Sequence, residues 1–331
     1  MIRKTLSIFL AILFLQSCNI GTSGTWKNDT IENEKRDQIK ALNDQFFKAL
    51  MTNNVKEVKT LLSDKLLEKG GNEIDKLIGD IYTTYKADSY RILDEYNVEN
   101  TTTNVGNTIP SGISKDNDYV INYLALNKDM YVSLLIPNGH QNELLITLIY
   151  GKYGDEWKIN IFHVGQYSFS KKTAPDFHKL AQESYKKSYL IDAINYSSMA
   201  KKCLRPGDEI FKYQKENDIN TLYDKLMAEA NAKYTFPLTL ENVNTKPVLY
   251  SIQPQMIIDQ GYSPMVWYIS KISVQDTTAL KVENEKVKTE VNNLFAGINK
   301  DKKYVFYRIS NEIPDGKKLV RHFGIIDKLK E

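Results

Sequence analysis

The stretch that decides the fold of the first half of the chain is LLITLIYGKYGDEWKINIFH, residues 144–163. Large apolar residues recur at every second position at its start, as expected for a strand with a buried face: Leu144, Ile146, Leu148 and Tyr150. The turn residues Gly154-Asp155-Glu156 separate this strand from the next one. The stretch therefore predicts a β-hairpin whose second strand, 157–169, presents four side chains on one face: Trp157, Ile159, Ile161 and His163.

Upstream of this hairpin the spacing of apolar residues predicts helices first and strands afterwards. Helical spacing covers residues 39–50, 55–66 and 74–85, with Gly70-Gly71 between the second and third runs. Period-two spacing covers residues 90–98, 119–126 and 130–136. The polar residues 100–117 between the first two strands predict a long loop. We therefore expect an α+β domain with its helices at the N-terminal end.

This order of elements resembles the nuclear-transport-factor-like cone fold. The residues that carry the resemblance are Asn43-Asp44-Gln45-Phe46-Phe47-Lys48-Ala49-Leu50 in the first helix and the closing Gly154-Asp155-Glu156-Trp157-Lys158-Ile159. The resemblance implies a domain over residues 35–170 in which N-terminal helices pack on a strongly bent, cone-like antiparallel sheet. It also implies that one face of the sheet lines a cavity.

Enzymes of the cone fold often carry an Asp-His pair in that cavity. The resemblance therefore makes Asp94, Trp157 and His163 candidate pocket residues, with Asp94 orienting the imidazole of His163 and stabilising its charged form. The residues leave an alternative open. His163 can equally be a half-exposed residue near a strand end, and Asp94 an edge or bulge residue.

The N-terminus has the features of a bacterial export signal. Arg3 and Lys4 precede the uncharged run TLSIFLAILFL, residues 5–15, which is too short to span a bilayer. The following Leu15-Gln16-Ser17-Cys18 resembles the lipobox of bacterial lipoproteins. The resemblance implies a signal peptide over residues 1–17 and lipid attachment through the sulfur of Cys18, with palmitate-like acyl chains. An ordinary cleaved secretory signal is the alternative.

This N-terminus sets the expected location and partners. The polar residues 18–34 predict a tether between the anchor and the folded chain. No acidic export tag stands at Asn19-Ile20-Gly21, so we expect the protein at the outer membrane, facing the periplasm. Loss of residues 1–17 leaves 42 basic and 41 acidic residues, too balanced for a nucleic-acid binder. The expected partners are the membrane, through the lipid anchor, and an envelope protein or a glycan.

The second half of the chain predicts a helical linker over residues 175–232 and a small α+β sheet domain over 235–331. Aromatic residues make up 11% of the whole chain, and they bind partners and sugars well but also pack within sheets. The members of this group that we considered for a contact patch are Tyr262, Trp267, Tyr268, Tyr304 and Tyr307.

Few residues suggest chemistry. The four histidines form no local metal-binding motif, and no phosphate-binding loop or nucleophile elbow is present, so we expect no metal and no cofactor. Cys203 ends an apolar helical stripe and is expected to be a buried structural thiol. The sequence thus favours a membrane-anchored, non-catalytic binding or assembly module. The alternative is a cone-fold enzyme or small-ligand binder with a pocket around His163.

Overall fold

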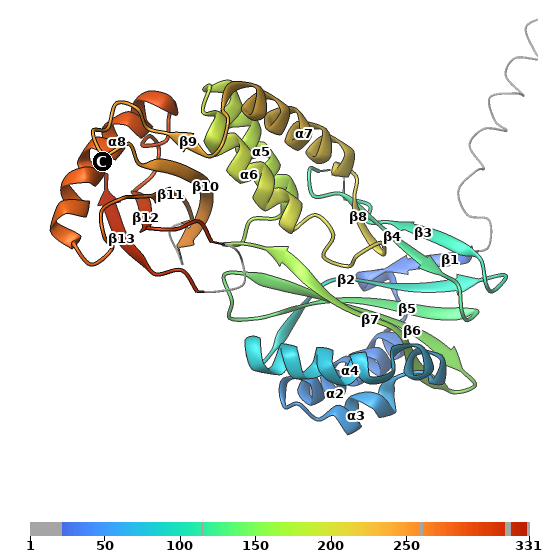
Figure 1. Cartoon of the computed structure of the whole chain (residues 1–331). Helices are drawn as coiled ribbons and strands as arrows, with labels where there is room; N and C mark the ends of the chain where they lie inside the picture. The colour runs from blue at the N-terminus through green and yellow to red at the C-terminus, as the bar shows by residue number, and fades with distance from the viewer. Residues whose placement is uncertain (1–21, 114, 258–260, 315–318, 330–331) are drawn as a thin grey trace, which may run out of the picture. The chain divides into compact units, whose positions relative to one another are not determined.

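The computed structural model describes residues 22–113, 115–257, 261–314 and 319–329. Within these residues the chain forms seven α-helices and three mostly antiparallel sheets, none of them closed, which confirms the α+β class (Figure 1). The chain divides into two compact units. The first unit runs up to Tyr167 and adds Arg205–Gln214, and the second consists of Ser168–Leu204 and Lys215–Glu331.

The first unit begins with three helices, close to where apolar spacing predicts them. They are α2 (Asn33–Met51), α3 (Val55–Leu61) and α4 (Asp64–Thr84). The side chains of Asn54 and Ser63 cap α3 and α4 by accepting hydrogen bonds from backbone N–H groups. The predicted break at Gly70-Gly71 appears inside the range of α4: Gly71 has a non-helical φ of 46° and ψ of −130°, so two helical segments meet there at a kink.

The main sheet of the first unit has the order β1-β2-β5-β6-β7. Its strands are β1 (Thr22–Lys27), β2 (Tyr90–Asn100), β5 (Asp129–Pro137), β6 (Glu143–Tyr153) and β7 (Glu156–Ser168). The expected tether over residues 18–34 is wrong for its described part. Residues 22–27 form an edge strand paired with β2, a 3-10 helix follows (Asn28–Thr30), and α2 has begun by residue 33.

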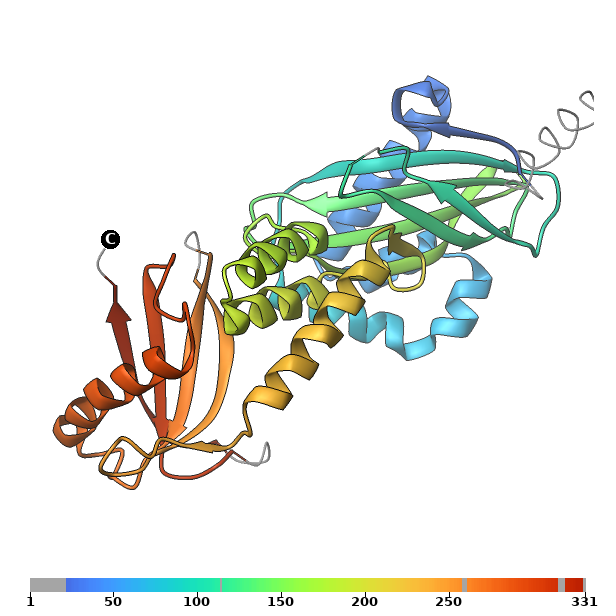
Figure 2. The ribbon, with the colours of Figure 1, turned by 90° about the horizontal axis from the view of Figure 1, so that it is seen from above.

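Both faces of this main sheet are covered. Helices α2–α4 pack on one face, where Ile39, Phe46 and Leu50 meet residues of β5–β7 in a fully buried core (Figures 1 and 2). The small sheet β3-β4-β8 belongs to the same unit and lies over the other face (Figure 1). Its strands are β3 (Gly106–Pro110), β4 (Tyr119–Leu124) and β8 (Phe211–Tyr213). The predicted loop over 100–117 therefore contains a strand.

The second unit is built on a five-stranded sheet of order β13-β12-β11-β10-β9. Its strands are β9 (Leu238–Thr239), β10 (Val248–Ile257), β11 (Gly261–Ile269), β12 (Tyr304–Ser310) and β13 (His322–Lys328). Helix α8 (Thr277–Leu294) links the parallel pair β11 and β12 and packs on one face (Figure 2). Its buried side chains Leu280, Val287 and Val291 form the core with that face.

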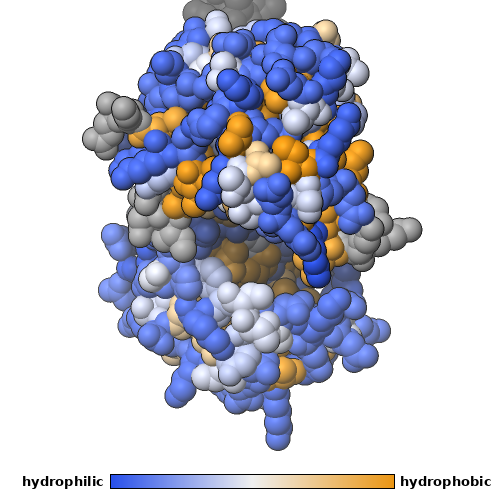
Figure 3. All heavy atoms as spheres, turned by 60° about the vertical axis from the view of Figure 1, so that its left-hand side comes forward, coloured by the Kyte–Doolittle hydropathy of each residue, from blue (hydrophilic) through white to orange (hydrophobic). Residues whose placement is uncertain are grey.

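The helices expected as a linker over 175–232 belong to this second unit. They are α5 (Ala174–Lys186), α6 (Leu190–Lys202) and α7 (Glu216–Lys233). Ile191 of α6 joins the core cluster of α8 and the sheet, and Asn195 donates a hydrogen bond to Tyr262 of β11. Residues 205–214, between α6 and α7, contribute β8 to the first unit instead. Hydrophilic residues cover most of the face shown in Figure 3, with hydrophobic residues in small groups.

Candidate functional site

Asp94 lies on β2 and is a buried carboxylate with every oxygen paired. Its Oδ1 accepts from Lys27 Nζ at 2.9 Å and Asn28 Nδ2 at 2.8 Å. Its Oδ2 accepts from the hydroxyls of Tyr119 and Tyr96, the latter at 3.4 Å. Burial raises the pKa of both tyrosines, which keeps the hydroxyls protonated as donors. Asp94 therefore ties β1 and β4 to β2.

His163 lies on β7, separated from β2 in the sheet by β5 and β6. At a strand spacing of about 4.8 Å the two strands are roughly 14 Å apart. The structure therefore does not form the expected pair of Asp94 and His163. Burial lowers the pKa of His163, and the charge of Asp208 opposes that shift.

The expected alternation along β7 fails after Ile159. Trp157 and Ile159 pack in the helix-covered core, and so do Phe162 and Val164. The side chains therefore change phase between residues 159 and 162, which turns His163 toward the other face of the sheet. Trp157 is a core residue, 6% exposed, with its ring edge-on to Tyr131.

The remaining sequence candidates give no reactive centre. Cys203 is buried, and burial raises the pKa of its thiol to about 12. Cys18 and the signal peptide lie outside the described residues. Among the described residues there is no cluster of three or more potential metal ligands. In the same part of the chain, no helix combines the length and the apolar character needed to cross a membrane.

The face of the second unit's sheet that α8 leaves open carries aromatic residues and an arginine. The guanidinium of Arg308 lies over the ring of Trp267, 5.1 Å from its centre, and Tyr250 packs edge-on against the same ring. This row continues as Met265, which is buried, and as Phe306 and Ile326, which are more accessible, on the paired strands β11, β12 and β13. Ile326 is 63% exposed. We call these six residues the open face.

The aromatic residues that the sequence singled out lie on both faces of the second unit's sheet. Tyr262, Tyr268 and Tyr307 are buried. Trp267 lies on the open face, and Tyr304 packs beside Phe306 there. Arg308 was missed, although its position between Tyr307 and Ile309 in a strand indicates that it points away from the core.

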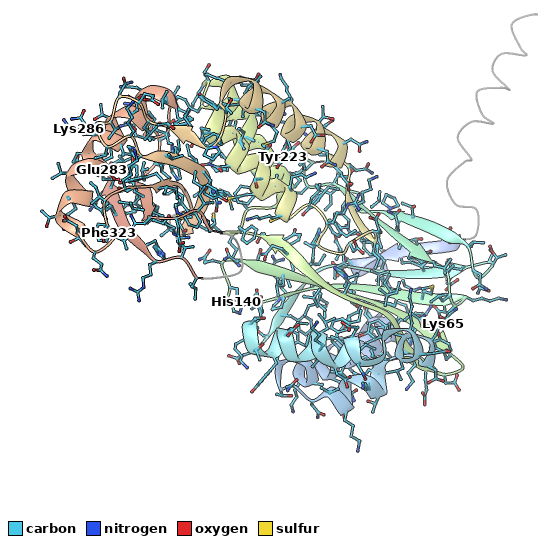
Figure 4. The ribbon with its side chains drawn as sticks, viewed as in Figure 1. Lys65, His140, Tyr223, Glu283, Lys286 and Phe323 are labelled. Atoms are coloured by element: carbon cyan, nitrogen blue, oxygen red, sulfur yellow. The ribbon has the colours of Figure 1, made fainter. Side chains whose placement is uncertain are left out.

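A hollow of about 660 Å³ lies in the second unit, between α8 and the loop that joins β9 to β10. Glu283 and Lys286 of α8, both labelled in Figure 4, line it. Thr245 of the loop lines it as well. Glu283 is 5% exposed, and neither carboxylate oxygen has a hydrogen-bond partner among the described residues. The sequence signal was a charged residue within the apolar stripe of Leu280, Val287 and Val291.

A second hollow, of about 700 Å³, lies in the first unit between α2 and the start of β2. Three of its polar side chains are paired with one another. The hydroxyl of Tyr90 donates to Asp44 at 2.6 Å, and Lys40 contacts the same carboxylate at 2.6 Å. Phe47 and Met51 provide apolar lining. This hollow is therefore less suited than the first to attract a charged ligand.

Comparison with known proteins identifies no relative: no family model, no curated protein and no solved structure matches this chain.

Proposed function

We propose that this chain is a lipid-anchored lipoprotein of the bacterial cell envelope that acts as a non-catalytic binding or assembly module. The lipobox-like Leu15-Gln16-Ser17-Cys18 supports the anchor. Strand β1 starts at Thr22, four residues after Cys18, so the chain between them reaches about 14 Å at most. The first unit would then lie close to the membrane surface, which we take to be the periplasmic side of the outer membrane.

The observation that carries the binding role is the open face of the second unit. Trp and Arg are the residues most enriched among binding hot spots, and Trp267 and Arg308 stack there. Arg308 has no ion-pair partner among the described residues, so its donors are available to a partner. An envelope protein is the partner we propose, and a glycan that stacks on the aromatic residues is the alternative.

We further propose that the first unit is a cone-like domain whose interior is filled. Three helices on one face of a five-stranded antiparallel sheet support the cone, and the register shift in β2 between Ile92 and Asp94 provides a bend. Ile39, Phe46 and Leu50 are fully buried in the space where a cone-fold enzyme has its cavity. This packing, with the separation of Asp94 from His163, favours a binding module over a pocket around His163.

Anchoring is tested by replacing Cys18 with serine and fractionating the cells. We expect the wild-type protein in the membrane fraction with acyl chains in its mass spectrum, and the C18S variant without them and released from the membrane. If C18S still sediments with the membranes, or if the wild-type mass contains no acyl group, the anchor proposal is wrong.

The open face is tested by affinity purification from solubilised envelopes followed by mass spectrometry. We expect a specific protein to co-purify with the wild type and to be lost with Ile326→Asp and with Arg308→Ala. Leu124→Asp is the matched control, because Leu124 is an exposed apolar residue of the first unit, 45% exposed. Recovery of the same proteins by all variants would contradict the proposal, and recovery of glycan alone would favour the alternative.

A further inference from the structure

The hollow beside α8 contains a buried charge without a counterpart. Glu283 lines it, and both of its carboxylate oxygens are buried without a partner among the described residues. A carboxylate removed from water without compensation is strongly unfavourable, and a bound cationic group removes most of that cost. Thr245 lines the same hollow, and its hydroxyl is also buried without a partner among the described residues. Both residues line the hollow although these polar atoms are covered, so a small rotation of either side chain would give its polar group a partner in a bound ligand.

The other side chains of the hollow add a positive charge and an apolar wall. Lys286 follows Glu283 by one helical turn, is exposed, and has no ion-pair partner among the described residues. Residues three apart on a helix are neighbours, so both side chains border one space. Val282, Ala279 and Ile272 form the apolar part of the wall. The volume of about 660 Å³ is in the range of small-ligand sites.

We propose that this hollow binds a free α-amino acid with an apolar side chain. Its ammonium group would pair with Glu283 and donate to Thr245, and its carboxylate would pair with Lys286. Its side chain would lie against Val282 and Ile272. Glu283 must turn its oxygens into the hollow to reach the ligand, since they are covered in the present arrangement. The inference rests on the proposed binding function but not on the anchor or on the open face.

The test is a calorimetric titration of the full protein, purified in detergent, with each of the twenty amino acids. We expect saturable binding of at least one apolar amino acid, with leucine as the first probe. Its N-acetyl derivative, which has no ammonium group, should bind at least about tenfold more weakly. Its methyl ester, which has no carboxylate, should bind about two- to fivefold more weakly, since Lys286 is exposed.

Variants assign the binding to this hollow. E283Q keeps the shape and removes the charge, and it should lose at least about tenfold in affinity. E285Q is the matched control, because Glu285 is an exposed glutamate two residues away that contacts Lys288. Thr245→Val and K286Q give weaker losses and remain informative if E283Q fails to fold.

Three results would overturn the proposal. One is the absence of binding by any amino acid up to about 10 mM, well above the ~1 mM Kd of a weak complex. The second is binding that E283Q and E285Q retain equally. The third is a K286Q variant whose unliganded form is destabilised as much as that of E283Q. Lys286 would then be the partner of Glu283 in solution, which leaves no unpaired charge for an amino acid to bind. Failure here leaves the tests of Cys18 and Ile326 unaffected.

Discussion

Lys302 places its ammonium 2.7 Å from the carboxylate of Asp192, and the two side chains are only 4% and 6% exposed. The ammonium also donates to the carbonyl of Gly297 at 2.7 Å. Burial lowers the pKa of Lys302 and raises that of Asp192, while each charge opposes the shift of the other. This ion pair joins α6 to the segment after α8 and so helps to make the helices part of the second unit.

Removal of one partner of this pair should be costly. Lys302→Met leaves the Asp192 carboxylate buried and uncompensated, which we expect to destabilise the second unit by about 3–5 kcal/mol in urea unfolding. Adding Asp192→Asn should recover at least half of that loss. Lys187→Met is the control, because the Lys187–Asp301 pair is exposed, and it should change little. Equal effects of both lysine replacements would contradict this account.

Tyr119→Phe tests whether Asp94 has a structural role. The change removes a donor to the buried Oδ2 of Asp94 and should cost about 1–3 kcal/mol in the unfolding of the first unit. Tyr153→Phe is the control, since Tyr153 also donates a hydrogen bond but is 43% exposed. An unchanged stability in Tyr119→Phe would show that the small sheet does not depend on this contact.

His163 should make the free energy of unfolding decrease as the pH falls below neutrality. Burial lowers the pKa of His163 in the folded state below the ordinary value of 6.5. Just below pH 6.5 the unfolded chain therefore binds a proton at this residue that the folded chain does not bind. Stability should therefore fall as the pH drops through 6.5 toward the folded-state pKa. His163→Gln should remove this part of the slope, measured by urea unfolding between pH 8 and about 5. Replacing the exposed His322 should leave this part of the slope unchanged.

Cys203 should be unreactive in the native protein. A thiol with a pKa of about 12 holds roughly a thousandfold less thiolate at pH 8 than an ordinary cysteine, and it is buried as well. We expect slow labelling by iodoacetamide in buffer and fast labelling in urea, measured by mass spectrometry. Rapid native labelling at Cys203 would show that α6 opens readily.

Apolar spacing was sufficient to predict most elements of the fold. The helices near Ile39, Val55 and Ile74 and the strands around the Gly154 turn all appear, since burial of one face imposes a period that is visible in the residues themselves. The edge strand β1 was missed because Thr22–Lys27 is polar and Gly-containing. Such a strand forms only because β2 offers its unpaired backbone groups to it.

The contacts of the candidate site residues could not be predicted either, because they also come from distant parts of the chain. Asp94 was singled out as a candidate pocket residue, but its partners Lys27 and Tyr119 come from strands whose pairing no local pattern predicts. A change of phase in β7 turned His163 away from the core face, and such a change leaves no mark in composition. Glu283 was missed although it is a charge in an apolar stripe, and only the tertiary structure shows that no group of the described residues neutralises it.

By itself the sequence determined the α+β class, the order of most elements and the lipobox-like start, because these depend on neighbours along the chain. The tertiary structure decided which strands pair, which charges meet and which remain alone. The physical reason is that the period of apolar residues indicates which side chains are buried but not which residues they contact. The electrostatic energy of a buried polar or charged side chain depends on those contacts, which come from distant parts of the chain.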